Sequence, residues 1–200
     1  MSEKNIISFS GGKDSTAMLL RMIELKENIH SVLYFDTEKE YPEIKEHIDK
    51  LKLNIPVRFV TVRHWLGFDY LKERYGEASI FGGWCTAAKR DTCNKYIRLI
   101  KKDYPNIIEC IGFSKDEKKR AVKLLNNKAK KWKLRFPLIE WGFSENDSLE
   151  YCKTNGYDFN GIYDWMPNGR TGCYDCPKMS KKSKLIVQNK YPHLFKGGGK

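Results

Sequence analysis

The most restrictive feature of the sequence is a regular alternation of short apolar runs with longer segments of helical periodicity. Strands are predicted at residues 5–9, 31–35, 57–62 and 107–111, and helices at residues 15–26, 41–53, 68–75 and 87–102. Such alternation implies βαβ units, in which parallel strands form one sheet and the connecting helices cover both of its faces. We therefore expect an α/β fold with a doubly wound, mainly parallel, Rossmann-like sheet.

A glycine-containing loop joins the first predicted strand to the first predicted helix. It consists of Ser10, Gly11, Gly12, Lys13, Asp14 and Ser15. The glycine pair lets the backbone turn tightly, so that successive N–H groups and the positive end of the helix face one point. The two serine hydroxyls add donors and the lysine adds charge, although the spacing is not that of the Walker P-loop. The loop predicts a site for phosphoryl groups.

The C-terminal part of the chain is less regular. A capping box at residues 144–147 predicts the start of a helix, and Gly156 predicts its end. Residues 157–177 are expected to form an irregular loop module that contains cysteines, and a basic helix is expected to follow as far as about residue 195. We expect residues 1–142 to form a nucleotide-binding α/β domain, with residues 143–200 as an extension packed on the same domain.

The composition restricts the class of protein. The apolar runs are all far shorter than the roughly 18 residues that span a bilayer, and no signal-peptide pattern opens the chain, so we expect a cytoplasmic protein without a membrane partner. Cytoplasmic thiols stay reduced, which favours metal-binding, reactive or buried roles for the six cysteines. The net charge of +12 arises mainly at residues 114–136 and 178–200, which indicates a phosphorylated small molecule or a nucleic acid as partner.

Four of the cysteines are candidate ligands of one metal centre. Cys173 and Cys176 form a Cys-x-x-Cys pair beside glycine and proline, a tight turn that points two sulfurs at one ion. Cys85 lies just before the long predicted helix and Cys93 about two helical turns further on. These residues leave open a 4Fe-4S cluster, a structural zinc ion or no metal. The other two, Cys110 and Cys152, are expected to be buried packing residues.

Several segments resemble, in the same order along the chain, the motifs of the phosphoadenosine phosphosulfate reductase family, a branch of the adenine nucleotide α-hydrolase superfamily. The loop at residues 10–15 resembles the family's pyrophosphate loop, or PP-loop. Four further segments resemble its later motifs, and they lie at residues 36–43, 112–120, 137–141 and 172–177.

The resemblance implies a set of site residues. ATP or a related adenine nucleotide, with Mg²⁺, would be bound by residues 10–15 together with Asp36, Gly112 and Arg120. Catalytic roles fall on Lys13, Asp14, Cys85 and Lys89. A 4Fe-4S cluster, or alternatively Zn²⁺, would be held by Cys85, Cys93, Cys173 and Cys176.

The sequence constrains the reaction less than it constrains the fold and the nucleotide site. Sulfonucleotide reductases attack sulfate with a cysteine near the C-terminus, and no cysteine follows Cys176 here. We therefore expect cleavage of ATP to AMP and pyrophosphate, with adenylation of an acceptor for sulfur transfer. The acceptor would be tRNA or another nucleic acid, and a separate protein could donate the sulfur. The alternatives are a sulfonucleotide reductase and a nucleic-acid-associated module with a regulatory nucleotide site.

Overall fold

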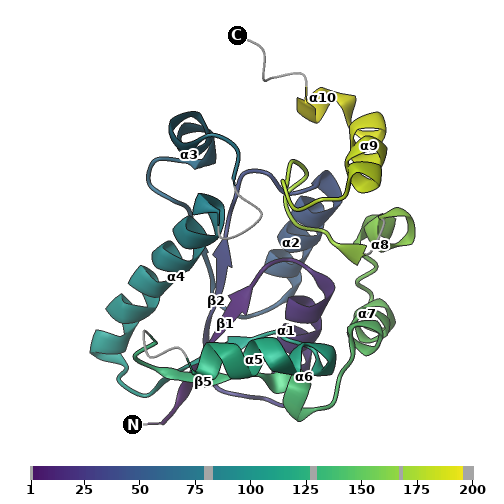
Figure 1. Cartoon of the computed structure of the whole chain (residues 1–200). Helices are drawn as coiled ribbons and strands as arrows, with labels where there is room; N and C mark the ends of the chain where they lie inside the picture. Colours follow the sequence, from purple (N-terminus) through teal and green to yellow (C-terminus); the bar gives the residue numbers. More distant parts are fainter. Residues whose placement is uncertain (1, 79–82, 127–129, 167–168, 196–200) are drawn as a thin grey trace.

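The computed structural model describes residues 2–78, 83–126, 130–166 and 169–195, and its centre is one parallel sheet (Figure 1). The strands are β1 (Lys4–Phe9), β2 (Ile29–Phe35), β3 (Phe59–Val62), β4 (Ile107–Ile111) and β5 (Lys133–Arg135). Their order across the sheet is β3-β2-β1-β4-β5, and every neighbouring pair is parallel. The expected doubly wound α/β fold is confirmed. The short strand β5 was not predicted, because three residues carry too little periodicity to be recognised.

The helices agree with the predicted segments to within three residues at each end over the first hundred residues. They are α1 (Lys13–Glu24), α2 (Pro42–Asn54), α3 (Phe68–Tyr75), α4 (Trp84–Asp103), α5 (Lys118–Leu125), α6 (Pro137–Glu140), α7 (Glu145–Thr154), α8 (Ile162–Trp165), α9 (Lys181–Lys190) and α10 (Pro192–Phe195), with 3-10 turns η1 (Lys115–Glu117) and η2 (Phe159–Gly161). The predicted final helix is divided in two, since Pro192 cannot continue α9.

Alternate side chains of the central strands face two different hydrophobic layers. Ile7 and Phe9 of β1 join the larger core beneath α1, α2 and α7, whereas Ile6 points to the opposite face and packs with Ile97 of α4. Figure 1 shows α4 on the other side of the sheet from α1 and α2. A strand that is apolar on both faces must be covered on both, so the central position of β1 follows from its sequence.

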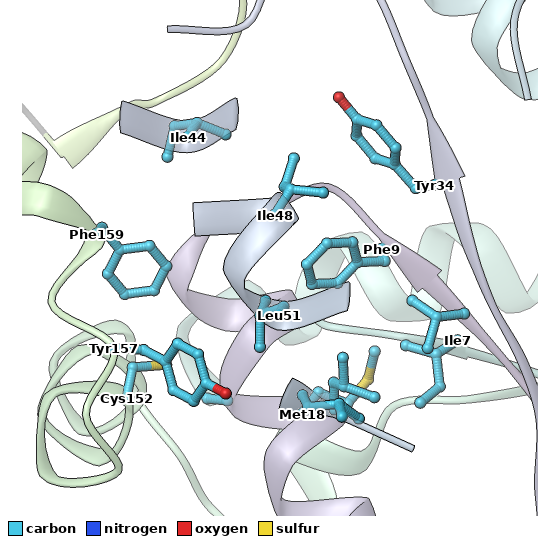
Figure 2. Packing of buried hydrophobic residues seen from close by; sticks show 14 of the residues in the cluster. Ile7, Phe9, Met18, Tyr34, Ile44, Ile48, Leu51, Cys152, Tyr157 and Phe159 are labelled. Carbon is cyan, nitrogen blue, oxygen red and sulfur yellow. The ribbon is translucent and has the colours of Figure 1, made fainter. Parts of the chain in front are cut away.

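The C-terminal extension packs into the same core as the N-terminal part. Cys152, Tyr157 and Phe159 are buried and lie against α2 residues such as Leu51 (Figure 2). Helix α7 packs along α1. Within the described residues, no helix is long and apolar enough to cross a membrane.

Two predicted helix signals in the extension are confirmed. Ser144 caps α7, and its side chain and that of Asp147 each bond the other's backbone N–H, which is a capping box. Gly156, with φ +83°, follows the end of the same helix. The segment 157–177, expected to be irregular, instead contains η2 and the short helix α8.

Part of the basic segment 114–136 is used inside the fold. Lys130 Nζ lies 2.6 Å from Glu109 Oε2, where the Glu109 carboxylate is buried in β4. Arg135 lies between Glu27, at 2.5 Å, and Glu140, at 2.9 Å. These two cations are therefore neutralised by the protein itself and do not add to a surface for polyanions.

Candidate functional site

The PP-loop lies at the point where the strand order of the sheet reverses. The chain passes from β1 outward through β2 and β3, and then crosses to β4 on the other side of β1. A crevice opens at the carboxyl ends of the strands at such a switch point, and ligands of doubly wound sheets bind there. Gly11 makes the required turn with φ +77°, and a Cβ on it would lie only 2.7 Å from Ile48 Cδ1. Only glycine fits this position.

The first backbone N–H groups of α1 are not capped by a side chain of the loop. Gly12 is the N-cap residue, and it has no side chain with which to accept the first helical N–H groups. The Ser10 N–H donates to Ser15 Oγ at 3.2 Å, and Ser15 Oγ donates to the Gly12 carbonyl at 3.0 Å. The serines thus hold the loop in shape. This arrangement of amides at a helix N-terminus suits the binding of phosphate.

A buried cation lies beside these amides. Lys13 Nζ is 3.2 Å from Asp14 Oδ2 and 2.9 Å from Glu145 Oε2. Burial opposes the charge of Lys13, but the Asp14 and Glu145 carboxylates outweigh it and hold the pKa of the lysine above its usual value. The lysine is therefore fully protonated at neutral pH. Burial also raises the pKa of Asp14, although the ammonium group opposes that shift.

One carboxylate oxygen of Asp14 lacks a hydrogen-bond partner in the part of the chain that the structure describes. Asp14 Oδ1 is buried and accepts no hydrogen bond from the described residues. A buried, unpaired carboxylate oxygen is costly, and in a phosphate site it is the kind of donor atom that Mg²⁺ prefers. The orphaned oxygen therefore fits the expected Mg²⁺.

Three residues that the sequence did not single out close over the loop. The Lys13 N–H donates to the Tyr163 hydroxyl at 2.8 Å, and that hydroxyl is also 3.0 Å from Thr171 Oγ1. Glu145 reaches the same lysine from the first turn of α7. These residues come from positions far along the chain, and no local motif marks them. The C-terminal extension thus supplies part of the wall around the PP-loop.

The other predicted nucleotide-binding residues take different positions. Gly112, just after β4, approaches the loop so closely that a Cβ on it would lie 3.1 Å from the Ser15 nitrogen. Asp36 follows β2, and its carboxylate accepts hydrogen bonds from Arg63 at 2.5 and 2.8 Å. Burial opposes its charge, but these bonds and one from the Glu38 N–H hold the pKa of Asp36 below its usual value. Arg120, on α5, pairs with Glu117 and is 64% exposed, so the structure shows it in a local ion pair.

The structure does not join the four candidate metal ligands into one centre among the described residues. The Cys176 N–H donates to the Cys173 carbonyl at 3.1 Å, the expected tight turn. Cys85 and Cys93 both lie on α4, where eight residues correspond to a rise of about 12 Å. Among the described residues, no group of three or more His, Cys, Asp or Glu side chains could hold a metal ion. As arranged, these thiols do not fit a cluster or a zinc site.

The thiols differ in their surroundings. Cys173 Sγ lies 3.4 Å from Thr37 Oγ1, and burial raises its pKa to about 11. Burial likewise raises the pKa of Cys93 to about 11. Lys89 opposes the shift at both thiols, which places its ammonium group within electrostatic reach of the two. Cys110 and Cys152 are fully buried, as expected of packing residues.

Comparison with known proteins identifies similar sequences. The model of the phosphoadenosine phosphosulfate reductase domain matches residues 4–179. An uncharacterized protein of Methanocaldococcus jannaschii is 24% identical over 195 residues, which is 95% of this chain. The chain spans 39% of the length of that relative.

Two solved structures share the fold. The U34-tRNA thiolase NcsA from Methanococcus maripaludis, with its 4Fe-4S cluster, superposes with a TM-score of 0.56 at 15% identity, over 97% of this chain and 67% of its own. The phosphoadenylyl-sulfate reductase from Candida auris, in a phosphate complex, has a TM-score of 0.56 at 12% identity, over 80% of this chain and 76% of its own. At such identities the likeness concerns the fold alone.

Proposed function

The chain belongs to the phosphoadenosine phosphosulfate reductase domain family, and from this membership we propose that it is a PP-loop enzyme that cleaves ATP to AMP and pyrophosphate to adenylate an acceptor for sulfur transfer. The observation that carries the proposal is the start of α1 at the switch point, where the N-cap residue Gly12 has no capping side chain, with the buried Lys13 ammonium beside it. Amides and a fixed cation in one crevice stabilise the charge that develops on a departing pyrophosphate.

The proposed reaction has two steps. An acceptor oxygen attacks the α-phosphorus, the bond from that phosphorus to the bridging oxygen breaks, and pyrophosphate leaves with the bond electrons. The loop amides hold the pyrophosphate, and the Lys13 ammonium exchanges its contact with Glu145 for a phosphate oxygen and neutralises part of the charge. A sulfur nucleophile then displaces AMP from the adenylated acceptor. Asp14, through its unpaired Oδ1, would hold Mg²⁺, which when bound supplies further neutralisation of the phosphates.

The proposed acceptor is tRNA or another nucleic acid. The fold likeness to a tRNA thiolase supports this choice, as does the net charge of +12. The proposed reaction uses no 4Fe-4S cluster or zinc ion, because the candidate cysteine thiols do not converge on one point among the described residues. The proposed sulfur carrier is Cys85, the second residue of α4, with Lys89 one helical turn further along the same helix. A persulfide of a sulfur donor protein would pass its outer sulfur to the Cys85 thiolate. Once that sulfur has displaced AMP, an external thiol would reduce the remaining S–S bond, which releases the thiolated acceptor and returns Cys85 to a thiol.

A sulfonucleotide reductase is the second candidate. The description of the matching family and the fold of the Candida auris reductase favour it. The two candidates share the PP-loop and differ in the ligand that binds tightly and in the product. A reductase binds phosphoadenosine phosphosulfate and releases sulfite with a thioredoxin, whereas the favoured enzyme binds ATP and releases pyrophosphate.

The test is calorimetry with ATP and with phosphoadenosine phosphosulfate, each with Mg²⁺, followed by a pyrophosphate-release assay with total tRNA and sulfide. We expect binding of ATP and release of pyrophosphate that depends on tRNA. Gly12→Val is the matched variant: Gly12 has φ −82°, which valine adopts without strain, and the added side chain would fill the space next to the Tyr163 hydroxyl. Heat with neither nucleotide, or unchanged affinity in Gly12→Val, would overturn the PP-loop assignment.

A further inference from the structure

A basic groove lies on the side of the sheet opposite to α1 and α2. It has a volume of about 520 Å³ and runs between the end of β3 and the outer face of α4. Four of its lining residues are cationic and none is anionic. The cations are Arg63, Lys95, Arg98 and Lys102.

The spacing of these cations follows one face of the helix. Lys95, Arg98 and Lys102 are separated by three and four residues, so their side chains line up along about 10 Å of α4. All three are exposed, and none forms an ion pair with a carboxylate of the described residues. Helix α4 carries two acidic residues: Asp91, which is paired with Arg90 at 2.8 Å, and Asp103, which directly follows Lys102 at the end of the helix. Three cations on this face exceed the acidic charge near them, so the face has a net positive charge for a partner.

The groove leads to the proposed active site. Arg63 lines the end of the groove at β3 and pairs with Asp36 and Glu38, so it adds no free charge but connects the groove to the carboxyl edge of the sheet, where Asp36 lies. A polymer bound along the groove and extending past Arg63 therefore reaches the carboxyl edge of the sheet, where the PP-loop lies. A second hollow, near Glu3 and Lys133, lacks this property, because these two residues pair at 3.1 Å and it lies at the amino end of β4.

We propose that the groove between α4 and β3 binds the phosphodiester backbone of an RNA strand and directs it toward the PP-loop. The three cations of α4 meet a repeating negative charge, and Leu99, which is 57% exposed between them, offers apolar contact to a ribose or base. The choice of RNA rests on the proposed function, in which a nucleic acid is the acceptor. Because these contacts are made to phosphates and not to base edges, binding depends on salt more than on base sequence.

The test uses fluorescence anisotropy with a labelled single-stranded RNA of about 20 nucleotides at about 50 and 200 mM salt. The variant is Lys95→Gln, Arg98→Gln and Lys102→Gln together. The matched control is Lys181→Gln, Lys182→Gln and Lys184→Gln, which removes the same charge from exposed positions of α9. Circular dichroism checks that both variants fold.

We expect the α4 variant to lose RNA affinity by at least about tenfold at low salt, and the salt slope to fall by about 2, since each lost phosphate contact of a single strand removes about 0.7. The α9 variant keeps most of the affinity. Equal losses in both variants, or no RNA binding by the unaltered protein, would overturn the proposal. Competition by polyglutamate as strong as that by RNA would also overturn it, and would point to an acidic protein partner.

Calorimetry with ATP separates this proposal from the proposed function. The α4 variant should bind ATP as the unaltered protein does, because none of its altered residues touches the PP-loop. If ATP does not bind to either protein while the RNA results hold, the proposed function fails and the groove remains. If ATP binds and the RNA results fail, the groove proposal fails and the proposed function remains.

Discussion

A buried histidine behind the PP-loop should make the stability of the fold depend on pH. His47 of α2 is 3% exposed, and its Nε2 lies 3.0 Å from Thr16 Oγ1 in α1. Its ring packs 4.2 Å from the ring centre of Phe159 and 5.6 Å from that of Tyr157. Burial lowers the pKa of His47 from 6.5 to about 4, and nearby Lys50 adds to the effect.

The sign of the effect follows from which state binds the proton. Between about pH 4 and 6.5 the unfolded chain is protonated at this histidine and the folded protein is not. The neutral histidine therefore makes its full contribution to the free energy of unfolding above about pH 6.5. This contribution is lost as the pH falls toward 4. A difference of about 2.5 units, at about 1.4 kcal/mol each, amounts to about 3 kcal/mol, of which about 2 kcal/mol is lost by pH 5.

The assay is urea unfolding followed by tryptophan fluorescence at about pH 7.5 and 5. The unaltered protein loses stability from every group that titrates in this range, so His47→Gln isolates the histidine. We expect the variant to lose about 2 kcal/mol less than the unaltered protein over this interval. His193→Gln, at an exposed position, serves as control and should behave as the unaltered protein. An identical pH dependence in His47→Gln and the unaltered protein would refute the reasoning.

Three further predictions concern the site and its support. Tyr163→Phe removes the hydroxyl that accepts the Lys13 N–H, so ATP affinity measured by calorimetry should rise several-fold; a fall would mean that the hydroxyl itself binds nucleotide. Gly112→Ala should weaken ATP binding because its Cβ displaces the Ser15 amide, whereas Gly172→Ala, with open space around it, should not. Glu109→Ala leaves the Lys130 ammonium buried and unpaired and should cost about 3–5 kcal/mol in urea unfolding, whereas Glu3→Ala at an exposed pair should cost below about 1 kcal/mol.

The part of the fold predicted from sequence is the part with strong local signals. The first four strands and four helices appear as expected, and so do the Ser144 capping box and the positive φ of Gly156. Strand β5 and helix α8 were not predicted, since neither is long enough for a periodicity to be counted. Within the site, the loop residues were predicted because a strand, a glycine pair and a helix follow one another directly.

The long-range parts of the site could not be predicted. The pair of Arg63 with Asp36 depends on how separate segments meet, because one residue follows β3 and the other follows β2. The four candidate metal cysteines show the same limit. Their spacing in the sequence permits a shared metal centre. In the structure α4 begins at Trp84, so Cys85 and Cys93 both lie on this helix and are held apart along its axis.

Local sequence patterns predict the alternation of strands and helices over the first 111 residues, the burial of β1 and the anion-binding turn before α1, because periodicity and turn chemistry act between residues close along the chain. The fold of the whole chain is needed to show that Tyr163 and Glu145 enclose Lys13, and that a basic groove between α4 and β3 leads to Asp36. Such contacts join residues more than a hundred positions apart or on different elements. Their partners are chosen by the packing of the whole chain, which no local pattern records.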